Sequence, residues 1–153
     1  MIMNIQGILL KTEKYNLHAH SQFCDGRDSM SDIAKAGVDA GFEYFAFTPH
    51  SPVNIDSPCN MKSSRMDEYR EESSRLRDLY SSDMKILTSL EIDYLGDEWG
   101  PHVDYFQRLP LDFRLGSVHF VPNQDGVFLD CDGRYERFAQ YLKQGFRDDL
   151  RYV

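Results

Sequence analysis

Short apolar, β-rich runs alternate with longer segments of helical periodicity along most of the chain. β-Rich runs bounded by turn residues predict strands at Tyr15 to His20, Tyr44 to Thr48, Lys85 to Glu91 and Phe113 to His119. Apolar positions recurring at helical spacing predict helices at Ser29 to Gly41, Met66 to Tyr80, Pro101 to Arg108 and Tyr135 to Phe146. Strands separated by helices are typical of an α/β fold with a parallel sheet.

The order of these elements also predicts where functional side chains gather. Right-handed crossovers place the carboxyl ends of parallel strands on one rim of the sheet, where α/β proteins keep their sites. No repeat, low-complexity tract or Gly/Ser linker interrupts the sequence, so residues 1–153 are expected to form part of one domain. With 41% hydrophobic residues, the chain can build a core without disulfides or structural metals.

Seventeen basic and 25 acidic residues give the chain a formal net charge of -8. That charge disfavours nucleic acid and anionic membranes as partners and favours divalent cations. The three cysteines, Cys24, Cys59 and Cys131, form no C-x-x-C pair, which argues against a disulfide framework or a thiolate zinc knuckle. Because no basic leader and no membrane-length apolar run are found, the protein is expected to be soluble and cytoplasmic.

Candidate metal ligands stand at the ends of the predicted strands. His18 and His20 alternate at the end of the first strand, so their side chains would point the same way. His50, Glu91 and His119 occupy the last or near-last positions of the next three strands. Four of the five histidines therefore share one rim, whereas histidines of a core would have no reason to prefer strand ends.

Asp25 is the sixth candidate ligand. It follows His20 in a loop where Gly26 permits a tight turn, which would fold the carboxylate back over the rim. Imidazoles and carboxylates suit zinc, manganese or iron(II). Six ligands exceed one tetrahedral site and indicate at least two cations, with Glu91 the best bridge because a carboxylate has two oxygens to share.

Plainer roles are expected for other polar residues. His102 follows Pro101 and is interpreted as an exposed histidine at a helix start. Cys24 is expected to pack beside Asp25, and Cys131 could reach a metal only if its loop returned to the rim. The sequence contains no P-loop, dinucleotide-binding turn or nucleophile elbow, which removes the usual NTPase, dehydrogenase and serine-hydrolase signatures.

Four stretches resemble motifs of the polymerase and histidinol phosphatase (PHP) family, most closely its monofunctional histidinol-phosphate phosphatases. They are Tyr15 to Gly26, Thr48 to Pro52, Leu90 to Tyr94 and Leu115 to Val121. The first contains H-A-H and C-D-G, the second T-P-H-S-P, the third the glutamate and the fourth G-S-V-H. The spacing between them is about that of the family, and the likeness covers most of the chain.

The resemblance implies a distorted (β/α)7 barrel with parallel strands and metal ligands at the strand C-termini. It also implies two to three divalent cations, zinc, manganese or iron. His18 and His20 would bind one metal, with Glu91 bridging to a second that is bound by His119. Asp25 and His50 would bind the third. The expected nucleophile is a metal-activated hydroxide, so no side chain is assigned as catalytic.

The sequence departs from the family after His119. Family members continue with further ligands, including a Gly-His-x-Asp-like motif, and this chain has no later histidine. Residues 1–153 are therefore expected to be the N-terminal portion of one PHP domain that lacks the C-terminal βα units. The open barrel edge would favour self-association. Four acidic residues are not expected to replace the missing ligands: Asp130, Asp132, Asp148 and Asp149. Apolar faces would be exposed at Leu76, Leu79, Phe138 and Leu142.

The expected function is hydrolysis of a small-molecule phosphate ester, L-histidinol phosphate, to L-histidinol and phosphate in histidine biosynthesis. One alternative is another PHP phosphoesterase acting on nucleotides or polynucleotide ends, which the net charge of -8 disfavours. A second alternative is a non-catalytic metal-binding or assembly module, which the missing ligands favour.

Overall fold

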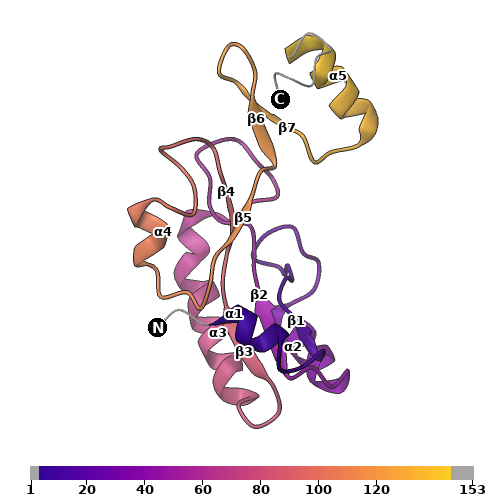
Figure 1. Cartoon of the computed structure of the whole chain (residues 1–153), viewed down its shortest axis with the longest axis vertical. Coiled ribbons are helices and arrows are strands. Elements are labelled where there is room, and N and C mark those ends of the chain that lie inside the picture. Colours follow the sequence, from indigo (N-terminus) through magenta and orange to yellow (C-terminus); the bar gives the residue numbers. More distant parts are fainter. Residues whose placement is uncertain (1–3, 146–153) are drawn as a thin grey trace. The chain divides into compact units, whose positions relative to one another are not determined.

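The computed structural model describes residues 4–145 of the chain (Figure 1). Its internal contacts divide it into two compact units. The first comprises the residues up to Ile92 together with Arg108–Leu115, and the second comprises Asp93–Gln107 together with the residues from Gly116 onward. A parallel sheet lies in the first unit and an antiparallel hairpin lies in the second.

The first unit is built around a three-stranded parallel sheet. Its strands, in spatial order, are β1 (Tyr15–Asn16), β2 (Tyr44–Phe47) and β3 (Lys85–Thr88). Tyr44 pairs with both Tyr15 and Lys85, which confirms the predicted parallel arrangement. β1 ends earlier than predicted because the side-chain oxygen of Asn16 accepts the His18 amide at 3.0 Å, so this amide bonds locally.

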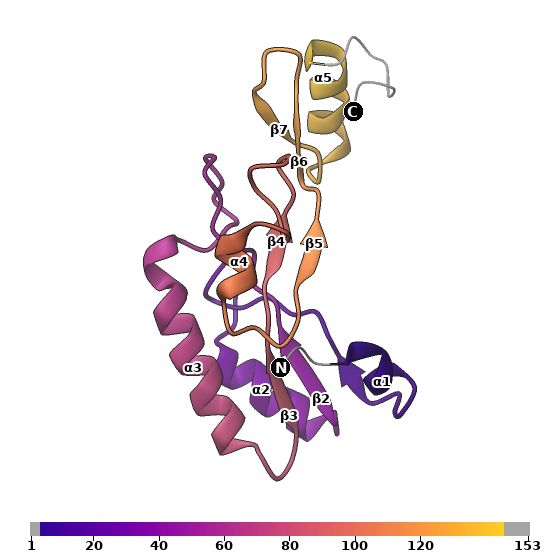
Figure 2. The same ribbon diagram turned by 60° about the vertical axis from the view of Figure 1, so that its left-hand side comes forward.

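Two helices cover one face of this sheet (Figure 2). They are α2 (Met30–Asp39) and α3 (Met66–Leu79), the latter preceded by the 3-10 turn η1 (Ser63–Arg65). Both helices were predicted from their periodicity. α2 begins where the sequence suggested, because the Ser29 hydroxyl accepts the Asp32 amide at 3.1 Å.

One apolar residue of α3 is placed differently from the expectation. Leu76 is fully buried, because it lies on the same helix face as the buried residues Tyr69 and Ser73. The prediction that it contributes to an exposed face is therefore wrong. Leu79 lies off that face and is 57% exposed, as expected.

Tyr69 joins α3 to the carboxyl ends of β2 and β3. Its side chain is fully buried, and its hydroxyl lies 2.6 Å from the carbonyl oxygen of Ser89 and 3.0 Å from that of Phe47. A buried carbonyl that loses a donor bears a desolvation cost without compensation. The hydroxyl therefore fixes the strand ends from which the candidate ligands continue.

Replacing Tyr69 with Phe is expected to lower the free energy of unfolding by about 1–3 kcal/mol, because buried carbonyl groups lose a partner. Urea unfolding followed by circular dichroism measures this change. Tyr135→Phe is the matched control, since Tyr135 is 78% exposed and its substitution is expected to cost less than about 0.5 kcal/mol. Equal losses in the two variants would contradict the role assigned to Tyr69.

The other face of the sheet is covered by a short helix that the sequence did not predict. This helix is α1 (Ile5–Leu9), which Figure 2 shows on the other side of the strands from α2 and α3. Its Ile8 lies in a buried cluster with Ala46 of β2 and Leu87 of β3. A groove of about 690 Å³ with largely apolar walls opens beside it. Its lining includes Ile5, Tyr15, Leu17, Phe42, Phe113 and Leu115.

The third predicted strand is interrupted at Ser89 and Leu90, so Glu91 begins a new strand, β4 (Glu91–Asp93), instead of ending β3. At the break, the Ser89 hydroxyl donates to the Phe113 carbonyl oxygen at 2.7 Å. β4 pairs with β5 (Leu115–Ser117), which is the middle of the fourth predicted strand. The residues through the break include neither proline nor glycine, so the pattern alone gave no sign of it.

The second unit contains an antiparallel hairpin at residues 120–130, where the sequence analysis predicted no strand. β6 (Phe120–Pro122) and β7 (Phe128–Asp130) pair in antiparallel fashion. The side-chain oxygen of Asn123 accepts two amides of the turn, and Gly126 has a φ of 78°. Glycine adopts that conformation without steric cost. The Asp-Gly dipeptide of this turn is a hairpin signal that the strand analysis overlooked.

The two helices of the second unit were predicted with different success. α4 (Asp104–Arg108) begins later than Pro101, because the preceding residues form a turn. α5 (Tyr135–Gly145) agrees with the prediction up to its last described residue. Phe146, at the predicted helix end, lies outside the described residues.

Two further expectations concern the exposure of apolar residues on α5 and the closure of a barrel. Phe138 and Leu142 of α5 are half-buried, so the expected exposure of these apolar residues is partial.

Between residues 4 and 145 the strands form three separate sheets, and no closed barrel is found among them. Among these same residues, no helix has the length and apolar character needed to cross a bilayer.

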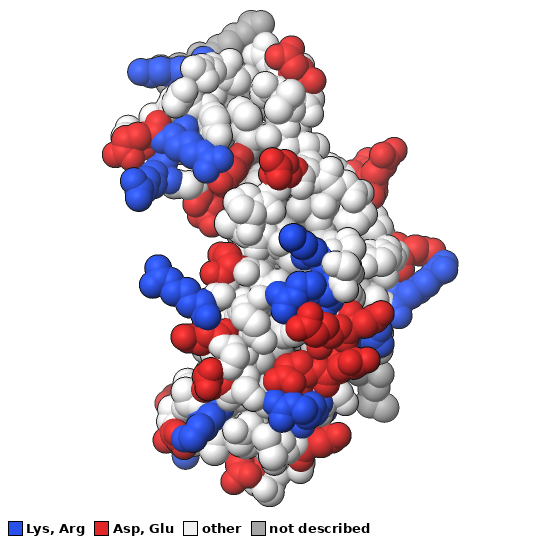
Figure 3. Space-filling model, turned by 180° about the vertical axis from the view of Figure 1, so that it is seen from behind, with Lys and Arg blue, Asp and Glu red and all other residues white. Residues whose placement is uncertain are grey.

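The solvent face of α3 carries ion pairs between residues one turn apart. The pairs are Arg65 with Glu68 at 3.0 Å, Arg70 with Asp67 at 3.2 Å and Arg75 with Glu72 at 2.7 Å. Figure 3 shows acidic and basic side chains next to one another on the face that it draws. Such mixed charge does not provide the continuous basic surface that polynucleotides require.

Candidate metal centre

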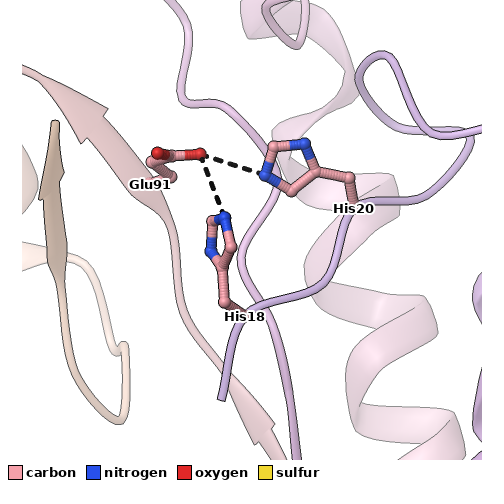
Figure 4. A group of neighbouring side chains, drawn as sticks. All are labelled: His18, His20 and Glu91. Atoms are coloured by element: carbon pink, nitrogen blue, oxygen red, sulfur yellow. Dashed lines mark hydrogen bonds and ion pairs between the residues drawn. The ribbon is translucent and has the colours of Figure 1, made fainter. Parts of the chain in front are cut away.

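Three imidazole rings converge on one carboxylate oxygen in the first unit. Glu91 Oε2 lies 3.0 Å from His20 Nε2, 3.2 Å from His50 Nδ1 and 3.8 Å from His18 Nε2. Figure 4 shows the rings of His18 and His20 directed at this carboxylate. Glu91 is only 6% exposed, and a buried carboxylate requires positive charge nearby. Four predicted ligands are thus brought together.

Main-chain hydrogen bonds hold His50 beside Glu91. The Glu91 amide donates to the Pro49 carbonyl oxygen at 3.1 Å, and the Ser51 amide donates to the Glu91 carbonyl oxygen at 2.8 Å. His50 and Glu91 form a parallel bridge that extends the sheet pairing past the end of β2. The position of both side chains therefore follows directly from the strand arrangement.

His18 and His20 stand on a loop after β1 and not on the predicted strand. Thr48 holds this loop: its amide donates to the Ala19 carbonyl oxygen at 2.9 Å, and its hydroxyl accepts the Ala19 amide at 3.2 Å. The same hydroxyl lies 2.7 Å from His18 Nδ1. Occupying Nδ1 in this way leaves Nε2 directed toward Glu91, which is the orientation that a metal ligand needs.

His20 lies between two carboxylates. Its Nδ1 is 2.8 Å from Asp25 Oδ1, while its Nε2 faces Glu91. Hydrogen bonding to Cys24 and then to Glu91 raises the pKa of His20 to about 11, although burial opposes the rise. A metal ligand must be deprotonated at the binding nitrogen, so a cation that binds His20 displaces a proton there.

Asp25 is carried by a loop that returns to the histidines. Its Oδ2 lies 3.8 Å from His50 Nε2. Burial raises the pKa of Asp25, but hydrogen bonds from His20 and Cys24 outweigh it, so the pKa lies below its usual value. The carboxylate is therefore available as a ligand at neutral pH.

The loop can return only because residue 26 is glycine. A Cβ at Gly26 would lie 2.3 Å from the Ser21 amide nitrogen, which is closer than any real contact. The Arg65 guanidinium supports the same loop by donating to the Gln22 carbonyl oxygen at 2.6 Å and lying over the Phe23 ring. Sequence reasoning expected a tight turn here, and the structure adds this close approach.

Gly26→Ala is expected to weaken zinc binding at least about tenfold, because relieving such a contact costs about 1–3 kcal/mol and moves Asp25. Competition with a chelating dye measures the affinity. Gly133→Ala is the control, since a Cβ there meets its nearest atom, in Arg137, only at 3.5 Å. Equal affinities in the two variants would show that the loop position does not matter for binding.

His119 has its own arrangement in the second unit. Its Nδ1 lies 2.8 Å from Asp93 Oδ1, and its amide donates to the same oxygen at 3.1 Å. Asp93 is fully buried. A carboxylate on one imidazole nitrogen fixes the tautomer and directs the other nitrogen to a metal. The sequence analysis missed Asp93, although alternation along β4 places it on the same side as Glu91.

Three residues given plainer roles can now be placed. His102 Nε2 bonds to the Asp97 carbonyl oxygen at 2.9 Å. The loop that carries Cys131 turns back to His119, because the Cys131 amide donates to the His119 carbonyl oxygen at 2.8 Å. Asp132 Oδ2 lies 3.8 Å from His119 Nε2 but is highly exposed. Asp148 and Asp149 lie outside the described residues.

The donor set fits divalent cations. Two groups of three ligand atoms, each within 4.8 Å of one another, lie in the first unit: His18, His20 and Glu91, and His20, Cys24 and Asp25. Imidazole and carboxylate donors suit zinc and other first-row metals. The appearance of Cys24 in the second group is new, because the sequence analysis expected this residue only to pack.

The chain is similar in sequence and in fold to proteins named histidinol phosphatases. The histidinol-phosphatase of Bacillus subtilis is 30% identical over 149 residues, which cover 85% of this chain and 52% of that protein. A Listeria monocytogenes structure named as a histidinol phosphatase superposes with a TM-score of 0.69 at 22% identity, covering 82% of this chain and 52% of that one.

A second solved structure is the histidinol phosphate phosphatase of Lactococcus lactis, complexed with zinc, L-histidinol and phosphate. It superposes with a TM-score of 0.58 at 21% identity and covers 71% of this chain and 41% of that one. The chain spans 52% of the length of the Bacillus subtilis relative and smaller shares of the other curated histidinol phosphatases that it matches. The PHP domain matches residues 16–151. The chain therefore belongs to the PHP domain family.

Proposed function

We propose that residues 1–153 are the N-terminal portion of a PHP phosphomonoesterase that hydrolyses L-histidinol phosphate to L-histidinol and phosphate. The observation that carries this proposal is the convergence of three imidazoles within 3.8 Å of one buried carboxylate oxygen. The Bacillus subtilis relative bears the name of this activity, and the Lactococcus lactis structure holds zinc together with both reaction products.

In this proposal the predicted ligands hold two to three zinc, manganese or iron(II) ions. His18, His20 and Glu91 hold one cation, Asp25 and His50 hold another, and His119 contributes to a further one. When bound, such cations acidify a water molecule and neutralise charge on the phosphoryl oxygens. The protein's own contribution is orientation, because Thr48, Asp25 and Asp93 each fix the ring of one histidine.

The proposal also includes a distorted (β/α)7 barrel that further βα units complete. Two features of the first unit support it. β1 is an edge strand of only two residues, and the groove of about 690 Å³ beside it has largely apolar walls. Without a partner these surfaces favour self-association, because an unpaired edge and an apolar patch both recruit another chain. Sedimentation of the purified chain measures that association.

Phosphate release from L-histidinol phosphate tests the proposed reaction. The 153-residue chain, loaded with zinc or manganese, is expected to release phosphate faster than its Glu91→Gln variant and to lose this activity with a chelator. A nucleoside monophosphate serves as the second substrate and should be a poorer one, because L-histidinol phosphate carries a cationic amine that partly offsets its phosphate charge near a chain of net charge -8, and the nucleotide has no such amine.

Two outcomes contradict the proposal. A chain that binds metal but releases phosphate no faster than the Glu91→Gln variant would be a metal-binding or assembly module. Faster turnover of the nucleotide would assign the chain to a different PHP phosphoesterase.

A further inference from the structure

Cys24 lies next to two of the proposed metal ligands. Its sulfur, a ring nitrogen of His20 and a carboxylate oxygen of Asp25 all lie within 4.8 Å of one another. Cys24 is half-buried. The thiol therefore faces ligands, and the expectation that it only packs does not describe its surroundings.

The main chain holds Cys24 in this place. Its amide donates to the Ser21 carbonyl oxygen at 3.0 Å, closing a turn that begins beside His20. The close approach of Gly26 to Ser21 keeps the following residues folded back. The Arg65 guanidinium lies 4.5 Å from the centre of the Phe23 ring and fixes the loop from the other side. The sulfur thus approaches the histidine through a constrained loop, which is the kind of support that a metal ligand needs.

We propose that Cys24 is a metal ligand beside Asp25, and that its thiolate makes this part of the centre selective for zinc-like cations. On binding, the thiol proton passes to the buffer and sulfur replaces a water molecule on the cation. Thiolate ligands favour zinc, cobalt(II) and iron(II) over magnesium or manganese, whose preferred donors are oxygens. The inference rests on the proposed metal centre but not on the catalytic step.

The other two cysteines provide matched controls. Cys59 is exposed, and Cys131 is half-buried with its sulfur 3.2 Å from the His119 carbonyl oxygen. Among the residues that the structure describes, neither sulfur belongs to a group of three ligand atoms within 4.8 Å of one another. All three cysteines can be replaced by serine with little change in volume, so the variants differ in position and not in chemistry.

Cobalt(II) titration of the 153-residue chain tests the proposal. A thiolate bound to cobalt gives a sulfur-to-metal charge-transfer band in the near ultraviolet, which nitrogen and oxygen ligands do not. The band is expected in the wild type, Cys59→Ser and Cys131→Ser, and it should vanish in Cys24→Ser while cobalt remains bound by elemental analysis. Zinc affinity should fall at least about tenfold in Cys24→Ser, with manganese affinity unchanged.

Alkylation keeps the proposal testable even if Cys24→Ser folds poorly. In the wild type, zinc should slow the reaction of Cys24 with iodoacetamide by at least about tenfold while that of Cys59 stays constant, as followed by mass spectrometry. A cobalt-loaded wild type without the band, or a band that persists in Cys24→Ser, would overturn the proposal. A wild type that has phosphatase activity but lacks the band would reject Cys24 alone as a ligand, whereas a wild type that shows the band but has no activity would reject only the proposed reaction.

Discussion

A Glu91→Gln variant is expected to bind zinc more than about a hundredfold more weakly than the wild type. Glu91 is the acceptor on which three imidazoles converge. Removing one partner from a buried charge cluster costs about 3–5 kcal/mol. Glutamine keeps the volume but loses the charge, so the imidazoles would remain near a neutral amide that binds no cation well. Elemental analysis after dialysis against a weak chelator measures the loss.

His102→Gln is the control for that experiment. It replaces a histidine of the same chain that bonds to a main-chain carbonyl oxygen, so the metal content should stay unchanged. If both variants kept the same amount of metal, the role assigned to Glu91 would be wrong. Thermal unfolding of the two variants in the presence of a strong chelator separates a folding defect from a loss of ligation.

The second large effect concerns turnover. The 153-residue chain is expected to hydrolyse L-histidinol phosphate at least about a thousandfold more slowly than the Bacillus subtilis histidinol-phosphatase, of which it spans 52%. In the proposed partial domain, incomplete coordination weakens both the activation of water and the neutralisation of phosphoryl charge, each worth several kcal/mol. About 4 kcal/mol of lost stabilisation already gives a thousandfold effect.

Side-by-side assays with zinc or manganese decide this second prediction. The oligomeric state must be measured in the same buffer, because association could complete a site that one copy lacks. Comparable rates from a monomeric 153-residue chain would show that the described ligands suffice, and the proposal of a partial domain would have to be abandoned.

The site was more predictable from sequence than the architecture around it. Parallel strands bring their carboxyl ends to one rim, and this rule alone placed Glu91 and His50 together. The bridge between these two residues has that origin. Asp25 was predicted less directly, through the glycine that follows it. The structure shows why residue 26 must be glycine: its backbone lies so close to that of Ser21 that a Cβ would clash. A single sequence does not reveal this close approach.

The failures have local physical causes. The predicted strand through His20 ends early because Asn16 offers its side chain to a neighbouring amide, and side-chain to main-chain bonds of this kind compete with strand pairing. α1 was missed because its helix is only five residues long and is held by the contacts of Ile8 with the sheet. Tertiary packing, rather than helix periodicity, explains such a short helix.

The proposed ligands of the first unit come from three separate stretches of chain, and His20 and Glu91 are 71 residues apart in sequence. A cation held between them would act as a reversible cross-link, closing a long loop in the way that a disulfide does in secreted proteins. At a free concentration one hundred times the dissociation constant, such binding adds about 2.7 kcal/mol to the folded state. The supply of trace metal in the growth medium would then govern how much of this protein escapes proteolysis.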